Sequence, residues 1–502
     1  MHPRIRALAA AASAAAVSAT LLAAAPAAAH PHGVDWGPCD GADPAEPVEC
    51  ATIEVPLDYD RPRGEQIEIG LARRQAANPD ERLGTIVLGP GGPGGSGVQW
   101  VIDGNTLTGE AAERFDLVGF DPLGVNTSTR VVCDKEAVNA VSYLPPEDEA
   151  SFQALVDANG ALAEDCRERT GELFDHVSNL ETVEDLERVR RALGEGRLNY
   201  LGYSYGTLIG QQYAEAYPHR IRTMVLDGNL DHSTGSVWGH MAPMTAGFEE
   251  NFIAFADWCE AEPECALHGE DVESVYADLK AKSRSGELID PYDGYPLDFQ
   301  FLTNLYTFTA HFPQAWPRLA ADFAAMRDGA RFTGAAAVRE EPVLVENPGF
   351  PMRCQDWDWE VGTYQELESI MEGLAEAYPN VEWSPANSNA LTCIGSGIEH
   401  VNEHHELDVP RSAPPIVFVG SLHDYVTVHE WSRTAAEQAG GHLVTYEGYW
   451  HGAYGFKTEC VDDAVNAYFV HRAVPEADLS CPNADFPRYG ASESAPPEAD
   501  RY

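Results

Sequence analysis

The segment Gly202-Tyr203-Ser204-Tyr205-Gly206 has the pattern G-x-S-x-G. In this pattern the serine sits on a strained turn between a strand and a helix, and the residues two before and two after it must be small so that strand and helix can approach each other. The flanking sequence fits this context, because an apolar run at 198–202 precedes Ser204 and a helical pattern covers 205–217. The segment therefore predicts a strand–turn–helix unit with Ser204 as a nucleophile.

Apolar runs and amphipathic stretches alternate along the chain on both sides of this segment. Strands are expected at 51–56, 66–72, 85–88, 115–120, 223–226, 415–420 and 442–446. Helices are expected at 183–193, 429–439 and 461–471. Short buried strands that alternate with helices predict an α/β fold, with a mostly parallel sheet covered by helices on both faces.

The alternation stops after Asp231, and the residues that follow are rich in helix formers, aromatic side chains and loops. The simplest interpretation is one sheet domain interrupted by a large helical cap. The expected boundaries are 30–231 for the first part of the core, 232–410 for the cap, 411–489 for the second part of the core and 490–502 for a flexible tail.

A serine is a weak nucleophile at neutral pH unless a neighbouring base takes its proton and a third group orients that base. In folds with this turn, the order along the chain is serine, acid, histidine. Asp424 follows the expected strand at 415–420, and His451 follows the one at 442–446. We predict Ser204 as nucleophile, His451 as general base and Asp424 as the orienting acid; the alternative for Asp424 is an ordinary turn residue.

The glycine-rich segment Pro90-Gly91-Gly92-Pro93-Gly94 follows the expected strand at 85–88. Its position predicts an oxyanion hole formed by the N–H of Gly92 and the N–H of Tyr205, and one such donor is typically worth about 3–4 kcal/mol. The segment also fits the dinucleotide-binding pattern G-x-G-x-x-G, but Pro90 and Pro93 lack the N–H groups that a pyrophosphate would use.

The segment His400-Val401-Asn402-Glu403-His404 fits the zinc-peptidase pattern H-x-x-E-H. It lies at the end of the irregular region, just before Pro410, where helical periodicity is weak. A solvated, histidine-rich stretch is the favoured interpretation, so we expect no metal and no other cofactor.

The formal net charge is −48, and only four residues are lysine. Such a surface repels nucleic acids and anionic membranes, because their phosphate groups carry charge of the same sign. We therefore expect neither nucleic acid nor a membrane as a partner, and interpret the charge as a contribution to solubility.

Residues 1–29 have the features of an export signal: Arg4 and Arg6, a mostly apolar run at 7–25, and the small-residue site Ala27-Ala28-Ala29. A membrane anchor is the less favoured alternative, because the run is mostly alanine. The ten cysteines are an even number in a chain that we expect to be secreted, so disulfides are expected. The sequence alone leaves the connectivity open, and the simplest pairs are the sequence neighbours Cys39/Cys50, Cys133/Cys166, Cys259/Cys265, Cys354/Cys393 and Cys460/Cys481.

Together these motifs resemble the α/β-hydrolase serine aminopeptidases related to proline iminopeptidase, in particular the secreted tripeptidyl aminopeptidases of actinomycetes. The resemblance covers nearly the whole chain after the export signal and is carried by Glu49-Cys50-Ala51-Thr52, Val55-Pro56-Leu57-Asp58-Tyr59, Gly91-Gly92-Pro93-Gly94-Gly95-Ser96-Gly97, Asp116-Leu117-Val118-Gly119-Phe120-Asp121-Pro122, Asn199-Tyr200-Leu201-Gly202-Tyr203-Ser204-Tyr205-Gly206-Thr207 and Asp424-x-x-Thr427. It implies the same triad, a helical cap over the site, and an exopeptidase that releases single residues or short peptides from free N-termini. Leu123 and Trp450 depart from the family pattern beside the expected cleft. The resemblance therefore implies the catalytic chemistry more closely than the substrate specificity.

An aminopeptidase needs carboxylates for the ammonium group of its substrate, because burying an unpaired charge is costly. The cap offers Asp356, Glu249, Glu250 and Asp358, with Asp356 as first choice because a disulfide at the neighbouring Cys354 could fix it. Peptides with a free N-terminus are therefore the expected partners. The alternatives are a secreted esterase or lipase-like enzyme with the same triad, and a non-catalytic binding protein, against which the intact triad argues.

Overall fold

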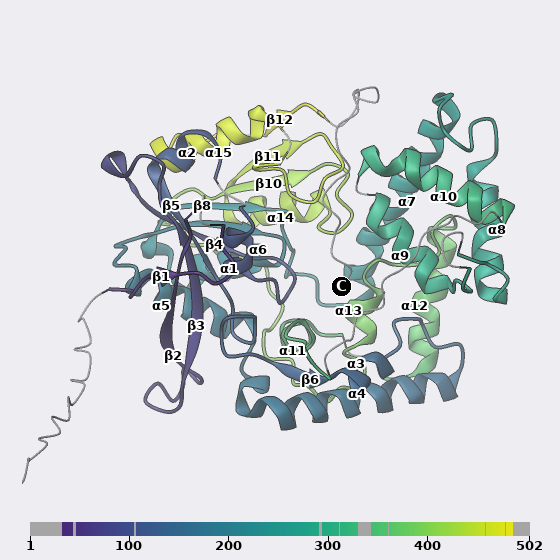
Figure 1. Ribbon diagram of the computed structural model, residues 1–502, viewed down its shortest axis with the longest axis horizontal. Helices are drawn as coiled ribbons and strands as arrows, with labels where there is room; N and C mark the ends of the chain where they lie inside the picture. Colours follow the sequence, from purple (N-terminus) through teal and green to yellow (C-terminus); the bar gives the residue numbers. More distant parts are fainter. Residues whose placement is uncertain are drawn as a thin grey trace, which may run out of the picture.

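The computed structural model describes residues 33–43, 47–104, 107–290, 294–310, 312–329, 343–359, 361–456, 458–476 and 478–484. The expected export signal at 1–29 and the expected tail at 490–502 lie outside the described residues. Figure 1 shows a core built on a sheet beside a group of helices that forms the cap.

The strands are β1 (Gly37–Pro38), β2 (Glu49–Pro56), β3 (Gln66–Arg74), β4 (Gly84–Gly89), β5 (Phe115–Phe120), β6 (Val132–Asp134), β7 (Leu198–Tyr203), β8 (Ile221–Asp227), β9 (Leu344–Glu346), β10 (Val417–Ser421), β11 (His442–Tyr446) and β12 (Leu479–Cys481). One sheet has the order β1-β2-β3-β5-β4-β7-β8-β10-β11-β12, and β6 and β9 form a separate antiparallel pair. From β5 to β12 in this order the neighbours are parallel, whereas β1, β2, β3 and β5 pair antiparallel. The predicted fold class, an α/β fold with a mostly parallel sheet, is confirmed.

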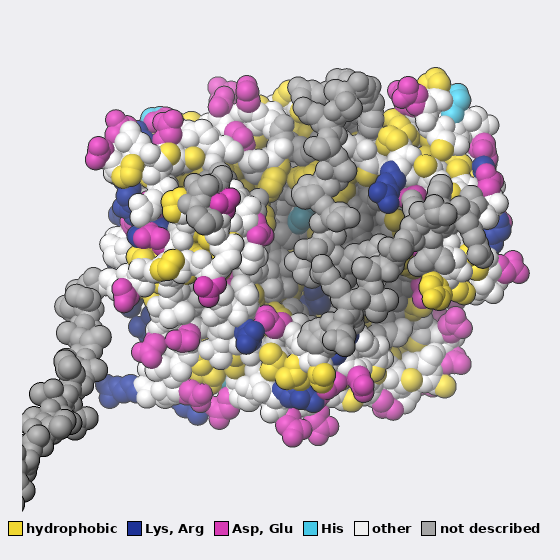
Figure 2. Space-filling view, in the orientation of Figure 1, with side chains coloured by type: hydrophobic (Ala, Val, Ile, Leu, Met, Phe, Trp, Pro, Cys, Tyr) yellow, Lys and Arg dark blue, Asp and Glu magenta, His cyan; other side chains and the backbone are white. Residues whose placement is uncertain are grey.

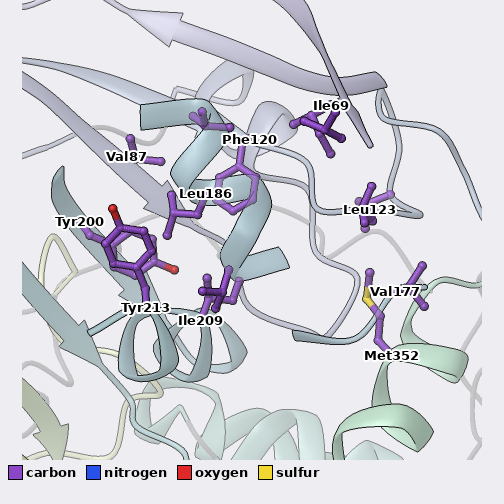
Figure 3. Packing of buried hydrophobic residues seen from close by; sticks show 14 of the residues in the cluster. Ile69, Val87, Phe120, Leu123, Val177, Leu186, Tyr200, Ile209, Tyr213 and Met352 are labelled. Atoms are coloured by element: carbon purple, nitrogen blue, oxygen red, sulfur yellow. The ribbon is translucent and has the colours of Figure 1, made fainter. Parts of the chain in front are cut away.

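The helices are α1 (Gly97–Ile102), α2 (Gly109–Arg114), α3 (Lys135–Ala140), α4 (Glu149–Thr170), α5 (Asn179–Ala192), α6 (Tyr205–Ala216), α7 (Val237–Ala261), α8 (Val272–Ser285), α9 (Phe299–Ala310), α10 (Trp316–Asp328), α11 (Gly349–Asp356), α12 (Tyr364–Ala377), α13 (Asn387–Leu391), α14 (His429–Ala439) and α15 (Glu459–His471). Successive strand side chains point to opposite faces of the sheet, so both faces need helical cover. Val87 packs in one cluster with Leu186 of α5 and Ile209 of α6 (Figure 3), while its neighbour Ile86 packs on the other face with Phe469 of α15.

The cap is assembled from two parts of the chain rather than one. Helices α7 to α10, which lie within the predicted insertion at 232–410, share an aromatic-rich cluster. Helix α4, however, precedes the nucleophile in the sequence and runs along the lower edge of Figure 1, beneath α11 and α12. The side-chain amide of Asn159 on α4 donates to the carbonyl oxygens of Leu391 and Ile394 at 2.7 and 2.8 Å. Residues 132–170 therefore help to form the cap, which the local sequence pattern did not indicate.

The structure forms disulfides between the sequence neighbours Cys39–Cys50, Cys133–Cys166, Cys259–Cys265, Cys354–Cys393 and Cys460–Cys481. Cys133–Cys166 ties β6 to α4, and Cys354–Cys393 ties α11 to the segment that follows α13. Across the described ranges, no helix combines the length and the apolar character that crossing a bilayer requires.

Candidate active site

Ser204 occupies the sharp turn between β7 and α6, with backbone angles φ 52° and ψ −122°. A positive φ is unfavourable for a residue with a side chain and persists only where the surroundings enforce it. The flanking glycines permit the turn: a Cβ on Gly202 would lie 2.6 Å from the carbonyl oxygen of Gly206, and a Cβ on Gly206 would lie 2.3 Å from that of Gly89. The predicted strand–turn–helix unit is present.

The predicted acid and base form a hydrogen-bonded pair. Asp424 follows β10 and His451 follows β11, and Nδ1 of His451 lies 2.8 Å from Oδ2 of Asp424. The hydroxyl of Thr427 donates to the same carboxylate oxygen at 2.9 Å, and the N–H of Val426 donates to the other at 2.8 Å. Asp424 is 2% exposed, so these donors hold its carboxylate in one orientation.

The environment of His451 favours its protonated form. Burial alone would lower the pKa of His451, but the charge of Asp424 and the hydrogen bond to it raise that pKa above its usual value, with a further contribution from Asp227. An imidazolium is the form that a general base adopts after it takes a proton from a serine. The electrostatics of the pair therefore suit a base at this position.

The nucleophile turn and the histidine loop meet at the carboxyl end of β8, which lies between β7 and β10 in the sheet. The N–H of Ser204 donates to the carbonyl oxygen of Asp227 at 3.0 Å. The next residue, Gly228, packs against His451: a Cβ there would lie 3.4 Å from Cε1 of the imidazole ring. Ser204, Asp424 and His451 thus follow β7, β10 and β11, parallel strands whose carboxyl ends lie at one edge of the sheet.

The predicted oxyanion donors lie beside the nucleophile. Tyr205 is the first residue of α6, where an N–H has no partner within the helix. Gly91 packs on the serine, because a Cβ on Gly91 would lie 3.0 Å from Cβ of Ser204, and Gly92 follows it. Within the described part of the chain, neither the N–H of Tyr205 nor that of Gly92 donates a hydrogen bond. The role of these two N–H groups as oxyanion donors stays a prediction.

A carboxyl group that the sequence analysis did not identify, Asp227, anchors the loop after His451. It is fully buried, and its Oδ2 accepts the N–H groups of Ala453 and Tyr454, both at 2.8 Å. Burial raises the pKa of Asp227 to about 6, against the effect of these two donors. Its one sequence signal is its place as the polar residue directly after the apolar run 224–226 of β8.

Asp227→Asn should move the acidic limb of the kcat/KM profile to lower pH. An asparagine oxygen can still accept both N–H groups, but the negative charge that helps to raise the pKa of His451 is lost. His451 then stays neutral, and able to accept a proton, at lower pH. A pH–rate profile from about pH 4 to 9 measures the shift. The control is Asp121→Asn, which alters another buried carboxyl group, one that accepts hydrogen bonds from Ser96 and Thr127. This control should leave the acidic limb in place. An acidic limb that does not move in Asp227→Asn would contradict the prediction.

The prediction that Asp356 binds the substrate ammonium group is wrong. Asp356 is 0% exposed, and its carboxyl group already accepts hydrogen bonds from Asn179, Tyr205 and Asn402. Burial raises the pKa of Asp356 to about 7, although these three donors act against the shift. A carboxyl group enclosed in this way has no open side for a substrate.

The other candidate carboxylates divide into one buried and two exposed groups. Glu249 is 7% exposed and accepts the N–H and the side-chain amide of Asn380 at 3.2 and 2.8 Å, so its prediction as an ammonium ligand is also wrong. Glu250 is exposed on α7, close enough to His423 for its charge to act on that imidazole. Asp358 is exposed and lines a cavity of about 430 Å³.

The two alternative motifs have other surroundings in the fold. The H-x-x-E-H segment at 400–404 is not helical, and both ring nitrogens of His404 have partners. Its Nδ1 bonds the carbonyl oxygen of His232 at 3.2 Å, and its Nε2 accepts the N–H of Asp358 at 3.1 Å. In the G-x-G-x-x-G segment, Gly89 ends β4, Gly91 packs against Ser204 and Gly94 packs against Gly349.

Acidic side chains are scattered over the core and the cap on the face in Figure 2, with basic side chains among them. This face is hollowed between the core and the cap. On this face the acidic groups are spread out rather than gathered in one patch, as expected when charge keeps a surface solvated.

Comparison with known proteins relates this geometry to a family. A family model described as the alpha/beta hydrolase fold matches residues 84–296, and a model described as a TAP-like protein matches residues 379–481. The chain is 29% identical over 481 residues to a tripeptidyl aminopeptidase of Streptomyces lividans, with 91% of this chain and 88% of the relative covered. It is 28% identical over 479 residues to serine protease Hip1 of Mycobacterium tuberculosis (89% and 91% covered), and 28% identical over 462 residues to Carboxylesterase B of the same species (86% of each covered).

The two family models fall on the segments that build the site. The first includes Ser204 and the glycine-rich loop, and the second includes Asp424 and His451. The relatives extend along nearly the whole chain rather than over one motif. The chain therefore has the α/β-hydrolase fold, and along nearly its whole length it is similar to serine peptidases that include the tripeptidyl aminopeptidases.

Proposed function

We propose that this protein is an exported serine aminopeptidase that cleaves single residues or short peptides from free N-termini. One arrangement carries the proposal. His451, which is hydrogen-bonded to Asp424, packs over Gly228. The residue before Gly228, Asp227, accepts the N–H of Ser204 with its carbonyl oxygen. An oriented imidazole beside a serine on a strained turn is what acyl transfer requires.

In the proposed reaction, His451 takes the hydroxyl proton of Ser204 while the serine oxygen attacks the scissile carbonyl carbon. The N–H groups of Gly92 and Tyr205 stabilise the oxyanion that forms. The imidazolium then gives its proton to the leaving amine, which leaves an acyl-enzyme. Water attacks this ester with His451 again as base, so the acyl product departs and the serine hydroxyl is restored.

Export is supported by the disulfides of the core and the cap. Disulfides form and persist in oxidising surroundings such as the cell exterior and are rare in the cytosol. The features of residues 1–29 point the same way, since a positive start, an apolar run and a small-residue site make an export signal.

Action on free N-termini is supported by the tripeptidyl aminopeptidases among the relatives. Because Asp356 and Glu249 are enclosed, the exposed carboxylates Glu250 and Asp358 are the candidates for contact with the substrate ammonium group. Glu250 is the first of the two, since it lies near His423, the residue before Asp424.

Glu250→Gln should lower kcat/KM for peptides with a free N-terminus by about 10- to 100-fold, which is the usual effect of losing a hydrogen bond to a charged group. N-blocked peptides and simple esters should be cleaved as before, because they carry no ammonium group. Parallel assays of the three substrate types measure the difference, with Asp358→Asn in the same panel. Glu260→Gln, at another exposed glutamate of α7, is the control; equal losses on all substrates would exclude Glu250 as the ammonium ligand.

Ester hydrolysis is the second candidate function, because one relative is a carboxylesterase and an ester substrate needs no ammonium site. Free and N-blocked peptide substrates beside short and long acyl esters separate the two functions. Preferential cleavage of free peptides supports the aminopeptidase. Ester cleavage without peptide cleavage would replace that proposal with the esterase.

A further inference from the structure

Helix α11 bridges the two segments that carry the predicted oxyanion donors. At its N-terminal end, a Cβ on Gly349 would lie 2.8 Å from the carbonyl oxygen of Pro93, and a Cβ on Gly94 would lie 3.0 Å from the nitrogen of Gly349. At its C-terminal end, the carboxyl group of Asp356 accepts a hydrogen bond from the hydroxyl of Tyr205. One helix of the cap therefore touches both sides of the oxyanion hole.

The contact at the C-terminal end of α11 is enclosed by other hydrogen bonds. Oδ1 of Asp356 accepts the N–H of Asn179 at 2.7 Å and the side-chain amide of Asn402 at 2.9 Å. The backbone oxygen of Asp356 bonds Nε2 of His232 at 2.8 Å. Asp356 is 0% exposed and Tyr205 is 8% exposed, so neither group can move without breaking buried hydrogen bonds.

The body of α11 is fixed to the core as well. The side chain of Gln355 donates to the carbonyl oxygen of Phe174 at 2.8 Å and accepts the N–H of Val177 at 3.2 Å. Cys354 is disulfide-bonded to Cys393, and both ends of the helix are packed. The helix therefore has the fixed position that a spacer between two donors requires.

We propose that Asp356 is a positioning residue of the oxyanion hole. Its carboxyl group holds the hydroxyl of Tyr205, and this contact keeps the Tyr205 N–H at a set distance from the glycine-rich loop at the other end of α11. The inference rests on the proposed function, since it takes Ser204 as the nucleophile. It assigns a catalytic consequence to a carboxyl group that cannot bind substrate. Loss of a whole oxyanion donor costs about 100- to 1,000-fold in kcat, so a misplaced donor should cost a part of that factor.

Tyr205→Phe tests the role, because it removes the hydroxyl group and leaves both the ring and the backbone N–H. We expect kcat to fall about 10- to 100-fold while KM changes less than about three-fold, since the oxyanion develops only towards the transition state. A peptide trifluoromethyl ketone, which forms an oxyanion when the Ser204 oxygen adds to it, should bind more weakly by a similar factor. The product peptide should bind as it does to the unaltered protein.

Tyr213→Phe is the matched control. It removes another buried hydroxyl group on α6 from a carboxylate, Oε2 of Glu187 at 2.9 Å. We expect a lower melting temperature and an unchanged kcat. Asp356→Asn supplies the conservative variant, because an amide can still bond the Tyr205 hydroxyl, and it should keep most of the activity.

An unchanged kcat in Tyr205→Phe, or equal weakening of the ketone and of the product peptide, would overturn the positioning role. Failure of a fluorophosphonate probe to label the unaltered protein would instead overturn the proposed function. The two failures are therefore distinguishable in one set of proteins.

Discussion

Replacing Ser204 with alanine should lower kcat about a million-fold. The serine oxygen is the atom that forms the bond to the acyl group, so what survives is the acceleration supplied by the oxyanion donors and by substrate binding. Hydrolysis of a free-amine peptide p-nitroanilide measures the loss. A fluorophosphonate probe, which reacts with activated serines, should label the unaltered protein and fail to label the variant.

Ser421→Ala is the control for this experiment. Ser421 ends β10 at the same edge of the sheet, is 1% exposed, and has a hydroxyl group with no hydrogen-bond partner among the residues that the structure describes. Its loss should leave both labelling and hydrolysis intact. Labelling that survives in Ser204→Ala would show that another residue is the nucleophile.

Asp424→Asn should lower kcat about ten-thousand-fold. The carboxylate accepts a hydrogen bond from Nδ1 of His451, which leaves Nε2 without a proton and able to act as base. An asparagine amide can donate to Nδ1 instead, and the imidazole then carries its proton on Nε2, where it cannot take one from Ser204. Steady-state kinetics measure the loss, and slow probe labelling should still occur at Ser204.

Asp185→Asn is the matched control, because Asp185 is also a fully buried carboxyl group that accepts a hydrogen bond, from the hydroxyl of Tyr59. We expect it to lower stability while kcat stays within about three-fold of the unaltered protein. A loss of less than about ten-fold in Asp424→Asn would mean that another acid orients His451. Adding Asp227→Asn in that background would show whether Asp227 is that acid.

Local sequence patterns determined much of the core. The expected helix at 429–439 and the expected strand at 442–446 coincide with α14 and β11, because apolar periodicity and the intervening Gly440 are signals within a few residues. The glycines at 202 and 206 were predictable for the same reason: the turn at Ser204 leaves no space for a Cβ on either. The approach of Asp424 to His451 also follows, since parallel strands end at one edge of the sheet.

Only the tertiary structure decided what each carboxyl group of the site contacts. Asp356 and Asp358 are two residues apart, yet the first is 0% exposed and the second is exposed. The partners of Asp356 at Asn179 and Tyr205 lie 177 and 151 residues away in the sequence. The hydrogen bond from Asn159 of α4 to the rest of the cap joins residues 232 positions apart. Spacing along the chain sets backbone conformation over a few residues. Solvent exposure, pKa and hydrogen-bond partners depend on which remote segments pack around a side chain, so they are decided when the chain folds.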